Sequence, residues 1–492
     1  MDTKALKDKI LQLAMQGKLV PQDENDEPAS VLLERIKKEK EPLIKNKKIK
    51  KEKALPEITE DEIPYELPKG WEWVRLGAIS FKITDGSHNP PKGEENRTKY
   101  LMLSSQNISS KGLINLGKSR FLSKENYDIE NKRTNLSKGD LLLTIVGSIG
   151  KSYIYNDNYN IVLQRSVGVI NTKYCNKYIK YFFDSPITQN YFKANSSGTA
   201  QKGIYLNQLK STIIALPPLN EQKRIVKKID SLFNLVDELE NNKQDLLQNI
   251  SDVRNKALQL AIQGKLVPQD ENDEPASLLL EKIKKEKEQL IKDKKIKKEK
   301  ALPEITEDEI PYELPKGWEW VRLGEYTQIN PRNNIDDNID VSFIPMAFIN
   351  EGFGSNYSYK IKKWCEIKKG FTHFAENDVI IAKITPCFQN RKSAVMKNLV
   401  NRYGAGTTEL YVIRTFNGLI IPEYLLINFK TNDFINGGLK TIVGTAGQQR
   451  IKKDYISNLL IPIPPLNEQK RIVEKLDSIM KLCDELESEL NN

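Results

Sequence analysis

The fold of this chain is decided by a stretch that starts at residues 217–225, Pro-Pro-Leu-Asn-Glu-Gln-Lys-Arg-Ile, and then continues without proline or glycine to Gln263. Its apolar residues recur in steps of three and four, at Ile225, Ile229, Leu232, Val236 and Leu239 and again at Leu246, Ile250, Val253, Ala257 and Leu260. This spacing is typical of a coiled-coil seam, which is narrower than the apolar face of a globular helix. The stretch therefore predicts one long helix that needs a partner helix.

The same opening recurs at residues 464–472, 247 positions later, and the chain ends at Asn492. The seam continues in the same register at Ile472, Leu476, Ile479, Cys483, Leu486 and Leu490. The rest of that repeat lies at the other terminus, where Leu6, Ile10 and Leu13 precede Val253, Ala257 and Leu260 by the same interval. We expect a closed, pseudo-twofold layout in which the long helix pairs antiparallel with a mate assembled from the C-terminal and N-terminal helices.

An internal duplication organises the rest of the chain. Residues 11–77 and 258–324 differ at only five pairs of positions, which are Met15/Ile262, Val31/Leu278, Arg35/Lys282, Pro42/Gln289 and Asn46/Asp293. In each copy a helix ends at glycine, and a second helix is expected to start near Ser30 or Ser277, capped by that serine or by the residues just before it. Two nearly identical segments should present nearly identical surfaces, which predicts two copies of the same partner.

The two intervening blocks, 78–212 and 325–459, barely resemble each other. Strands are predicted at Leu141–Val146 and Ile161–Ile170 in the first block, and at Asp378–Ile384 and Glu409–Thr415 in the second. Short helices are predicted near Tyr178–Phe192 and Pro422–Phe434. Each block is therefore expected to be an α+β domain.

Positive charge is concentrated in these blocks. The first holds 19 Lys and Arg against 9 Asp and Glu, and the second 17 against 12, within a net charge of +10. The lysine runs 37–53 and 284–300 are each followed by an acidic stretch, and we interpret them as solvated helix and linker. The excess in the blocks indicates where a polyanion would bind.

Composition and cysteine spacing limit the class of protein. No apolar run reaches the length of a membrane span, and Met1 opens directly into a polar amphipathic segment, so neither a signal peptide nor a membrane helix is expected. Cys175, Cys365, Cys387 and Cys483 show no CxxC spacing. They are predicted to be reduced, buried thiols of a cytoplasmic protein.

Several short motifs suggest catalysis but lack a required part. Residues 147–152, Gly-Ser-Ile-Gly-Lys-Ser, have Ile145 where a phosphate loop needs glycine, so a turn between strands is expected. Residues 89–92, Asn-Pro-Pro-Lys, lack the aromatic residue that amino-methyltransferases use. The two histidines, His88 and His373, are too few for a cluster and are expected in loops. The Trp71/Trp73 and Trp318/Trp320 pairs are expected to pack in the core.

The doubled Pro-Pro-Leu-Asn-Glu-Gln-Lys-Arg-Ile-Val motif before a long helix resembles the specificity (S) subunit of Type I restriction–modification systems. The segment 67–77, Leu-Pro-Lys-Gly-Trp-Glu-Trp-Val-Arg-Leu-Gly, and the helix end 16–23, Gln-Gly-Lys-Leu-Val-Pro-Gln-Asp, are similar to that family too. The resemblance covers essentially the whole chain. It implies two target-recognition domains joined by long antiparallel coiled-coil helices in an internally duplicated, circular arrangement.

The resemblance also implies where the domains of the chain begin and end and which subunit of the complex has which role. The divisions are an N-terminal helical segment and linker (1–66), recognition domain 1 (67–216), a central helical spacer and linker (217–313), recognition domain 2 (314–463) and a distal helix (464–492). Each recognition domain would read half of a bipartite, asymmetric DNA site. The helices would dock two modification subunits, which methylate adenine N6 with S-adenosylmethionine. Restriction subunits using ATP and Mg would join them where present. The chain itself would hold no cofactor and no catalytic site.

Candidate DNA contacts were chosen by residue type and loop position. For base readout they are Gln106, Asn107, Arg165, Gln201 and Lys202 in the first domain and Arg332, Lys383, Arg391, Gln448 and Arg450 in the second. Ser148 and Lys151 are candidates for phosphate contacts.

Three other classes of protein remain open from the residues alone. A stand-alone DNA-binding protein of the same fold would lack methyltransferase partners, which co-purification would show. A fused methyltransferase or nuclease is disfavoured because no cofactor loop is present. A purely structural scaffold leaves the two unlike basic blocks unexplained.

Overall fold

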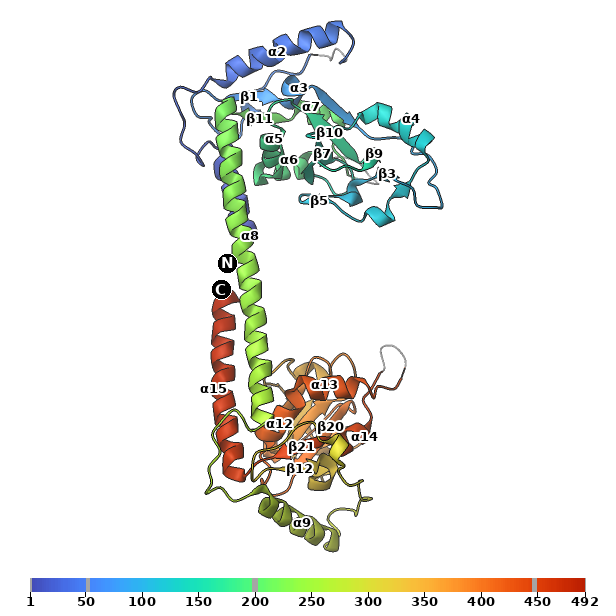
Figure 1. Ribbon diagram of the computed structural model, residues 1–492, viewed down its shortest axis with the longest axis vertical. Helices are drawn as coiled ribbons and strands as arrows, with labels where there is room; N and C mark the ends of the chain where they lie inside the picture. The colour runs from blue at the N-terminus through green and yellow to red at the C-terminus, as the bar shows by residue number, and fades with distance from the viewer. Residues whose placement is uncertain (1, 50–53, 197–201, 445–448, 492) are drawn as a thin grey trace. The chain divides into compact units, whose positions relative to one another are not determined.

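The computed structural model describes residues 2–49, 54–196, 202–444 and 449–491 (Figure 1). The chain separates into two compact units, which we call unit 1 (residues 1–242) and unit 2 (residues 243–492). Helix α8, Leu219–Ile262, is 44 residues long and contributes to both. The long helix predicted from residue 217 onward is therefore confirmed.

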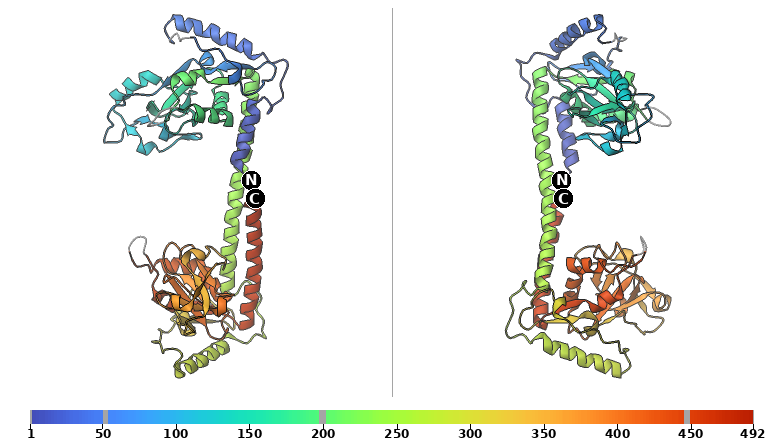
Figure 2. Two further views of the ribbon diagram at one scale, coloured as in Figure 1. Left: turned by 180° about the vertical axis from the view of Figure 1, so that it is seen from behind. Right: turned by 45° about the vertical axis from the view of Figure 1, so that its right-hand side comes forward.

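Each unit places a second helix antiparallel to its part of α8 (Figure 2). In unit 1 this is α1 (Thr3–Met15), where Thr3 Oγ1 donates to Glu240 Oε2 at 2.7 Å and Lys7 Nζ lies 2.6 Å from Asp237 Oδ1. In unit 2 it is α15 (Leu466–Asn491), where the Arg254 guanidinium lies 2.5 Å from Asp484 and 2.7 Å from Glu487. Both halves of the predicted split mate therefore pack on α8 within their own units.

The predicted seam is only partly correct. Ile225, Ile229, Val236, Ile250 and Ala257 are buried, as expected. Four other predicted seam residues are 44–50% exposed, and these are Leu239, Leu246, Val253 and Leu486. Toward its two ends α8 packs against one of the predicted recognition domains (67–216 and 314–463) as well as its partner helix, so burial there follows a wide face. Farther from those domains a single partner helix cannot cover the whole stripe.

The repeated motif forms the junction between α8 and the start of the recognition domain. In unit 1 Glu221 Oε2 accepts a 2.9 Å hydrogen bond from the indole Nε1 of Trp71, and Glu221 Oε1 accepts one of 3.1 Å from Gln22. Arg224 pairs with Asp26 at 2.6 Å. Burial raises the pKa of the Glu221 carboxyl. The motif therefore links the start of α8 to Trp71 and to the 22–26 segment, which are distant in sequence. These contacts explain why charged residues of the motif lie at a buried junction.

Unit 2 repeats this junction with the same partners. Glu468 accepts from Trp318 at 2.9 Å and from Gln269 at 3.0 Å, and Arg471 pairs with Asp273 at 2.7 Å. Gly17 and its repeat Gly264 both have φ near +67°, and an added Cβ would lie 2.4 Å from Pro68 or Pro315. Glycine is therefore required at both helix ends by conformation and by space.

Helices α2 (Ala29–Lys45) and α9 (Ala276–Lys292) contain the first part of each lysine run. Neither is capped by the predicted serine, because each N-cap is a proline, Pro28 or Pro275, that makes no side-chain cap bond. The first helical N–H instead donates to a backbone carbonyl, Ala29 to Gly70 and Ala276 to Gly317. The serine alternative is therefore wrong, whereas the alternative of a cap just before the serine is correct, and the acceptor for the first N–H comes from a distant segment of the repeat.

Two small sheets with helices against them form most of the predicted recognition domain of unit 1, beside the two-stranded pairs β1–β11 and β4–β5. The first sheet has the strand order β2 (Lys82–Asp85), β10 (Val167–Asn171), β7 (Leu141–Thr144) and β8 (Ser152–Ile154), all antiparallel. The second has the order β6 (Arg120–Phe121), β3 (Tyr100–Leu103) and β9 (Asn160–Leu163), with β3 and β9 parallel. The run predicted as one strand at 161–170 is thus two strands in different sheets, joined by the turn 164–166.

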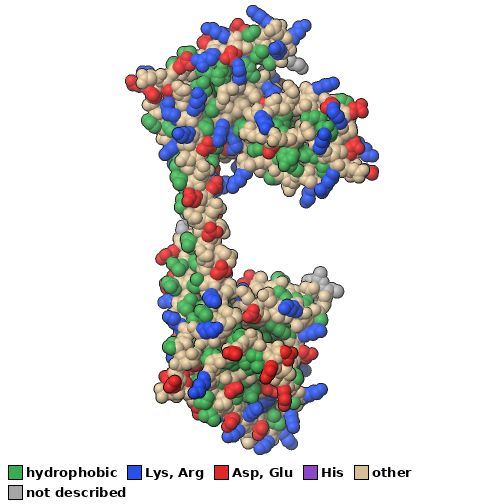
Figure 3. Space-filling model, in the orientation of Figure 1, with side chains coloured by type: hydrophobic (Ala, Val, Ile, Leu, Met, Phe, Trp, Pro, Cys, Tyr) green, Lys and Arg blue, Asp and Glu red, His purple; other side chains and the backbone are tan. Residues whose placement is uncertain are grey.

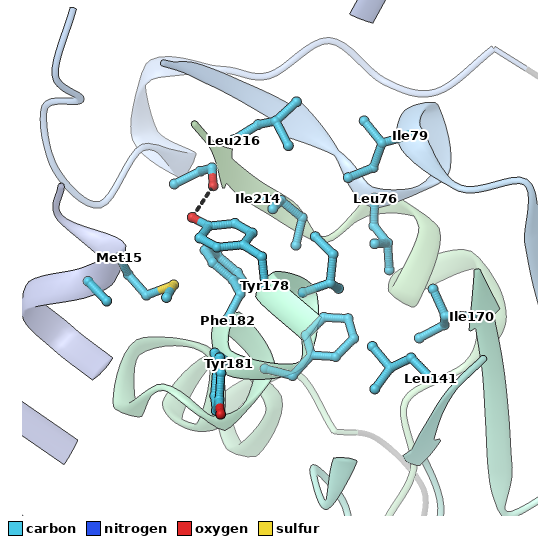
Figure 4. Packing of buried hydrophobic residues seen from close by; sticks show 14 of the residues in the cluster. Met15, Leu76, Ile79, Leu141, Ile170, Tyr178, Tyr181, Phe182, Ile214 and Leu216 are labelled. Atoms are coloured by element: carbon cyan, nitrogen blue, oxygen red, sulfur yellow. Dashed lines mark hydrogen bonds between the residues drawn. The ribbon is translucent and has the colours of Figure 1, made fainter. Parts of the chain in front are cut away.

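The core of unit 1 lies between its first sheet and α5 (Asn176–Asp184), α6 (Pro186–Asn195) and α7 (Leu206–Ser211). Tyr178 is fully buried there and donates to the Ala215 carbonyl at 2.6 Å (Figure 4). Ala215 belongs to β11 (Ile213–Leu216), which pairs with β1 (Glu72–Arg75). Met15 at the end of α1 joins the same cluster, so the recognition domain and the helix pair of unit 1 share one core.

The first sheet of unit 2 has the same topology as that of unit 1 although the sequences differ, whereas its second sheet has one more strand. Its first sheet has the order β13 (Thr327–Ile329), β20 (Leu410–Thr415), β17 (Val379–Ala382) and β18 (Ser393–Val395). Its second has the order β15 (Lys360–Lys363), β14 (Asp340–Ile344), β19 (Tyr403–Gly406) and β16 (Thr372–Ala375), with β14 and β19 parallel. Helices α12 (Pro422–Lys430) and α13 (Asn432–Leu439) follow, as predicted. The expectation of an α+β fold with internal duplication is confirmed.

Two residue-level expectations were wrong. Cys483 is buried and Cys175 and Cys387 are half-buried, but Cys365 is exposed. His373 lies in strand β16, not in a loop, and its ring packs against Trp364 with centroids 4.6 Å apart. Within the described ranges, no helix is both long and apolar enough to cross a membrane.

Candidate nucleic-acid interface

Unit 1 contains a polar concavity of ≈ 610 Å³, which we call groove 1. It is lined by residues from three segments: Ser104, Ser105 and Gln106; Val146, Gly147 and Ser148; and Gln164, Arg165 and Ser166. The segments follow strands β3, β7 and β9. Because β3 and β9 are parallel with Leu103 opposite Leu163, both strands end together and release their loops at the same place.

The backbone of groove 1 is held by bonds between these segments. Gln164 N donates to Leu103 O at 2.8 Å, and Ser105 N donates to Ser166 Oγ at 3.0 Å. Ile145 N donates to Ser166 O at 2.9 Å. These hydrogen bonds involve backbone groups and the Ser166 hydroxyl, and they hold the loops without the side chains of Gln106, Gln164 or Arg165. The shape of groove 1 is therefore preorganised.

The long polar side chains of groove 1 remain available. Gln106 and Arg165 are exposed and Gln164 is half-buried. None of the three side chains makes a hydrogen bond or ion pair to another residue in the described parts of the chain. Two amides and a guanidinium thus offer unsatisfied donors and acceptors at one surface. Gln164 was not among the predicted contacts, although its neighbour Arg165 was.

The other candidates in unit 1 are placed differently. Asn107 is buried, and its amide accepts from Ser104 N and donates to the Ile114 carbonyl, so it is already used within the loop. Ser148 lines groove 1 and donates to Ser105 O at 3.4 Å. Lys202 is exposed beside the groove, where its carbonyl accepts from Gly147 N at 3.2 Å. Gln201 lies outside the described residues.

Lys151 is exposed and lines a different concavity of ≈ 670 Å³ between α1, α8 and the recognition domain of unit 1. It follows the 147–150 segment that links β7 to β8, so the predicted turn between strands is confirmed. Lys and Arg side chains also recur over α2 and over the recognition domain on the face shown in Figure 3.

In unit 2 the structure brings Lys383 and Arg450 together. Ile384 forms an isolated β-bridge with Arg450, and Ile451 N donates to Lys383 O at 3.0 Å. Arg450 also makes a side-on pair with Glu409, Nε to Oε2 at 2.7 Å and Nη2 to Oε1 at 2.8 Å. This pairing holds the pKa of Glu409 below its usual value. Glu409 was not among the predicted contacts, and its pairing with Arg450 joins residues 41 positions apart.

Arg332 and Arg391 lie apart from that pair. Arg332 is exposed, and its Nη1 donates to Phe371 O at 3.3 Å. Arg391 donates to Lys430 O at 3.0 Å and to Asn255 Oδ1 of α8 at 3.3 Å, and its guanidinium lies 4.7 Å from the centroid of the Phe353 ring. Burial lowers the pKa of Arg391. Its contacts fasten the recognition domain of unit 2 to α8. Gln448 lies outside the described residues.

The clusters in the two units occupy equivalent positions in the sheet order. The segment after β7 bridges to Gly203 through Val146, and the segment after β17 bridges to Arg450 through Ile384. The turn 164–166 between β9 and β10 corresponds to the turn 407–409 between β19 and β20. The same frame therefore displays Gln164, Arg165 and Ser166 in one unit and Thr407, Thr408 and Glu409 in the other.

Nothing in the described ranges resembles a metal centre, since no three His, Cys, Asp or Glu side chains gather there in a group that could hold an ion. The arrangement in both units is thus one of polar loops on small sheets.

Comparison with known proteins gives consistent matches. The family described as Type I restriction modification DNA specificity domain matches residues 68–249 and 315–492. The chain is 50% identical over 244 residues to the Type I restriction enzyme EcoAI specificity subunit of Escherichia coli, which is 49% of this chain and 41% of that protein. It is 47% identical over 250 residues to the EcoEI specificity subunit of Escherichia coli, 51% of this chain and 42% of that protein. The matches thus span about two fifths of these relatives' lengths.

A solved chain from a study of complex assembly and conformational transition of the type I R-M system has a similar fold. The TM-score is 0.56 at 20% sequence identity, and the match covers 87% of this chain and 94% of that one. At this identity the likeness concerns the fold alone.

Proposed function

This chain belongs to the family of type I restriction modification DNA specificity domains, and from that membership we propose that it is the DNA-recognition subunit of a Type I restriction–modification complex. In this proposal each recognition domain reads one half of a bipartite, asymmetric site. The chain itself performs no catalysis.

The observation that carries the proposal is that one sheet frame displays two different sets of polar side chains. Groove 1 presents Gln106, Gln164 and Arg165, and the corresponding place in unit 2 presents Lys383, Arg450 and Glu409. Arginine donates bidentately to guanine O6 and N7, and glutamine pairs with adenine N6 and N7. Two domains that recognise different half-sites need different side chains at the equivalent positions of a shared fold.

The charge distribution supports binding to duplex DNA. The block 78–212 holds ten more basic than acidic residues, and the block 325–459 holds five more. Contacts of Lys and Arg with phosphates supply most of the affinity of such proteins, whereas base-edge contacts supply specificity. Ser148, Lys151 and Lys202 would contribute to the first kind of contact and the groove side chains to the second.

The helices offer surfaces for the proposed modification subunits. In unit 2 Leu246, Val253, Leu482 and Leu486 are 44–56% exposed on α8 and α15, and in unit 1 Leu235 and Leu239 are 53% and 48% exposed on α8. Apolar side chains exposed on neighbouring helices are typical of a surface covered by another chain. Two such subunits would carry S-adenosylmethionine, and a restriction subunit, where present, would use ATP and Mg.

Methylome sequencing tests this function directly. Cells that express this chain with its modification subunit should methylate adenine in a split, asymmetric motif. Cells lacking this chain serve as the control and should lose that motif. A palindromic motif, or a motif that does not depend on the chain, would contradict the proposal.

A domain exchange tests whether each recognition domain recognises its half-site independently of the other. Replacing residues 325–459 with the equivalent block of a relative should change one half of the motif and leave the other half unchanged. If both halves change, the two domains do not read independently.

A further inference from the structure

Beside groove 1 lies a network that neither the sequence motifs nor the proposed contacts use. Asp85, at the end of β2, is buried with 6% of its surface exposed. Its Oδ1 lies 2.5 Å from Arg133 Nη2, and its carbonyl accepts from Arg133 Nε at 3.0 Å. Its Oδ2 lies 2.7 Å from Nε2 of His88. The charge of Arg133, from α4 (Lys124–Thr134), balances the buried carboxylate.

The segment that carries His88 is locked to the wall of groove 1. Ser87 N donates to Leu163 O at 2.7 Å, and Arg165 N donates to Ser87 O at 2.9 Å. At Gly86 an added Cβ would lie 2.0 Å from Leu163 O, so only glycine permits this approach. His88 therefore stands next to the turn that displays Gln164 and Arg165, and its side chain is 53% exposed.

The carboxylate of Asp85 sets what the imidazole offers to a ligand. An ionised carboxylate only accepts hydrogen bonds, so the His88 nitrogen facing it, Nε2, carries a proton. In the neutral ring the outer nitrogen, Nδ1, is then an acceptor. An acceptor cannot bind a phosphate oxygen, but it can bind the exocyclic amino group of adenine N6 or cytosine N4 in the major groove. Groove 1 would thus combine the donors of Arg165 with a fixed acceptor.

We propose that His88 is a specificity-determining contact of unit 1, which accepts a hydrogen bond from an adenine or cytosine amino group, and that Asp85 and Arg133 are its positioning residues. This inference rests on the proposed function, because it assigns a further contact in the same half-site. It predicts that one position of that half-site favours adenine or cytosine over guanine and thymine through a residue outside the groove lining.

The test uses the chain in complex with its modification subunits and duplexes in which each position of the first half-site carries all four bases. His88→Ala should lower the preference for adenine or cytosine at one position about tenfold, which is the discrimination of a single good base contact. Binding to an unrelated duplex should not change. His88→Gln, which keeps an acceptor, should retain part of the preference.

Asp85→Asn tests whether Asp85 acts by positioning the His88 ring or only through its negative charge. It leaves the imidazole in place but removes the group that fixes its tautomer, so the same position should lose its preference. Asp128→Asn is the matched control, because Asp128 carries the same charge on α4 but pairs with Lys124 at an exposed site. The control should read the half-site as the unmodified chain does. Thermal unfolding of each variant would show whether Asp85→Asn still folds, and His88→Ala tests the contact independently since His88 is largely exposed.

Two outcomes would overturn the inference. A uniform loss of affinity across all bases would make His88 a phosphate contact, and unchanged discrimination would give it no role in recognition. Arg165→Ala distinguishes these from failure of the proposed function. If that variant alters readout of the first half-site whereas His88→Ala does not, only this further inference fails.

Discussion

Glu221 shows how a single buried carboxylate organises its surroundings. It accepts hydrogen bonds from Trp71 and Gln22, and Glu468 repeats both contacts in unit 2. Neighbouring Trp73 behaves differently, because its buried indole Nε1 has no hydrogen-bond partner in the described part of the chain, whereas its repeat Trp320 donates to Tyr312 O at 3.3 Å. Trp71 and Trp73 are thus expected to contribute unequally to the stability of unit 1, because, of these two indoles, only that of Trp71 donates a hydrogen bond to a described residue.

Trp71→Phe should destabilise unit 1 by about 1–3 kcal/mol through the lost hydrogen bond alone, because it leaves Oε2 of the buried Glu221 carboxyl without the indole donor. Urea unfolding of the purified chain would measure the change. Trp73→Phe is the matched control, since the same atoms are removed where no hydrogen bond exists, and it should cost less. Equal losses in the two variants would mean that ring packing, not the hydrogen bond, is responsible.

Glu62 provides a prediction about pH. The Arg75 guanidinium, which donates a hydrogen bond at 2.6 Å, lowers the pKa of the Glu62 carboxyl from its ordinary value of 4.5 to about 2. The native state therefore binds this proton less readily than the unfolded state, so the stabilisation is complete above about pH 4.5 and disappears as the pH falls toward 2.

Glu62→Gln should accordingly lower the melting temperature at pH 7, and its difference from the unmodified chain should shrink between pH 4.5 and 2. Differential scanning calorimetry over that range would follow it. Glu60→Gln, at an exposed carboxylate of the same 3₁₀ turn (Glu60–Glu62), should show no such pH-dependent difference. A Glu62→Gln deficit that persists unchanged at low pH would exclude the ion pair as its cause.

At the scale of elements, α8 changes its surroundings along its length. Ile229 is fully buried in the core shared with the recognition domain of unit 1, whereas Leu239, ten residues later on the same helix, is 48% exposed. The heptad pattern is the same at both positions. What differs is the number of elements that pack on the helix there.

Ile229→Ala should therefore destabilise the chain by about 2–5 kcal/mol, because it opens a cavity in a packed core. Leu239→Ala should change stability by no more than about 0.5 kcal/mol. Guanidinium unfolding of the isolated chain gives both values. Comparable costs would show that the seam is buried along its whole length, as the sequence pattern alone predicts.

At the scale of the whole molecule, the duplication gives each unit its own copy of the helical surface. Residues 11–77 and 258–324 are nearly identical, and each unit pairs its own helix with α8. A partner that recognises one unit should therefore recognise the other, which is the physical basis for expecting two modification subunits per chain.

Leu482→Asp combined with Leu486→Asp should reduce the bound modification subunits from two to one per chain. A charge on an apolar contact surface carries a desolvation cost on binding that these exposed sites do not have in the free chain. Native mass spectrometry or light scattering would count the subunits. Ile361→Asp is the control, because Ile361 is 62% exposed on β15 of the same unit. Retention of two subunits by the double variant would place the docking surface elsewhere.

The sequence by itself determined the features that depend on local pattern or on self-comparison. The seam period predicted α8, and the 247-residue repeat predicted the two equivalent junctions. The β-like runs predicted the two central strands of each first sheet, although the run 161–170 joined β9 with β10. Arg165, Gln106, Lys383 and Arg450 could be selected by residue type and loop position, and the structure places them on polar loops in their units.

Only the tertiary structure decided which residues meet. Groove 1 joins segments about sixty residues apart, because the parallel pairing of β3 with β9 ends two distant strands side by side. Glu409 meets Arg450 and Asp85 meets Arg133 across separations of 41 and 48 residues. Periodicity reports which face of an element is apolar, but it carries no information about which loops long-range strand pairing brings together. The fold class was therefore readable from the chain, whereas the recognition surface was not.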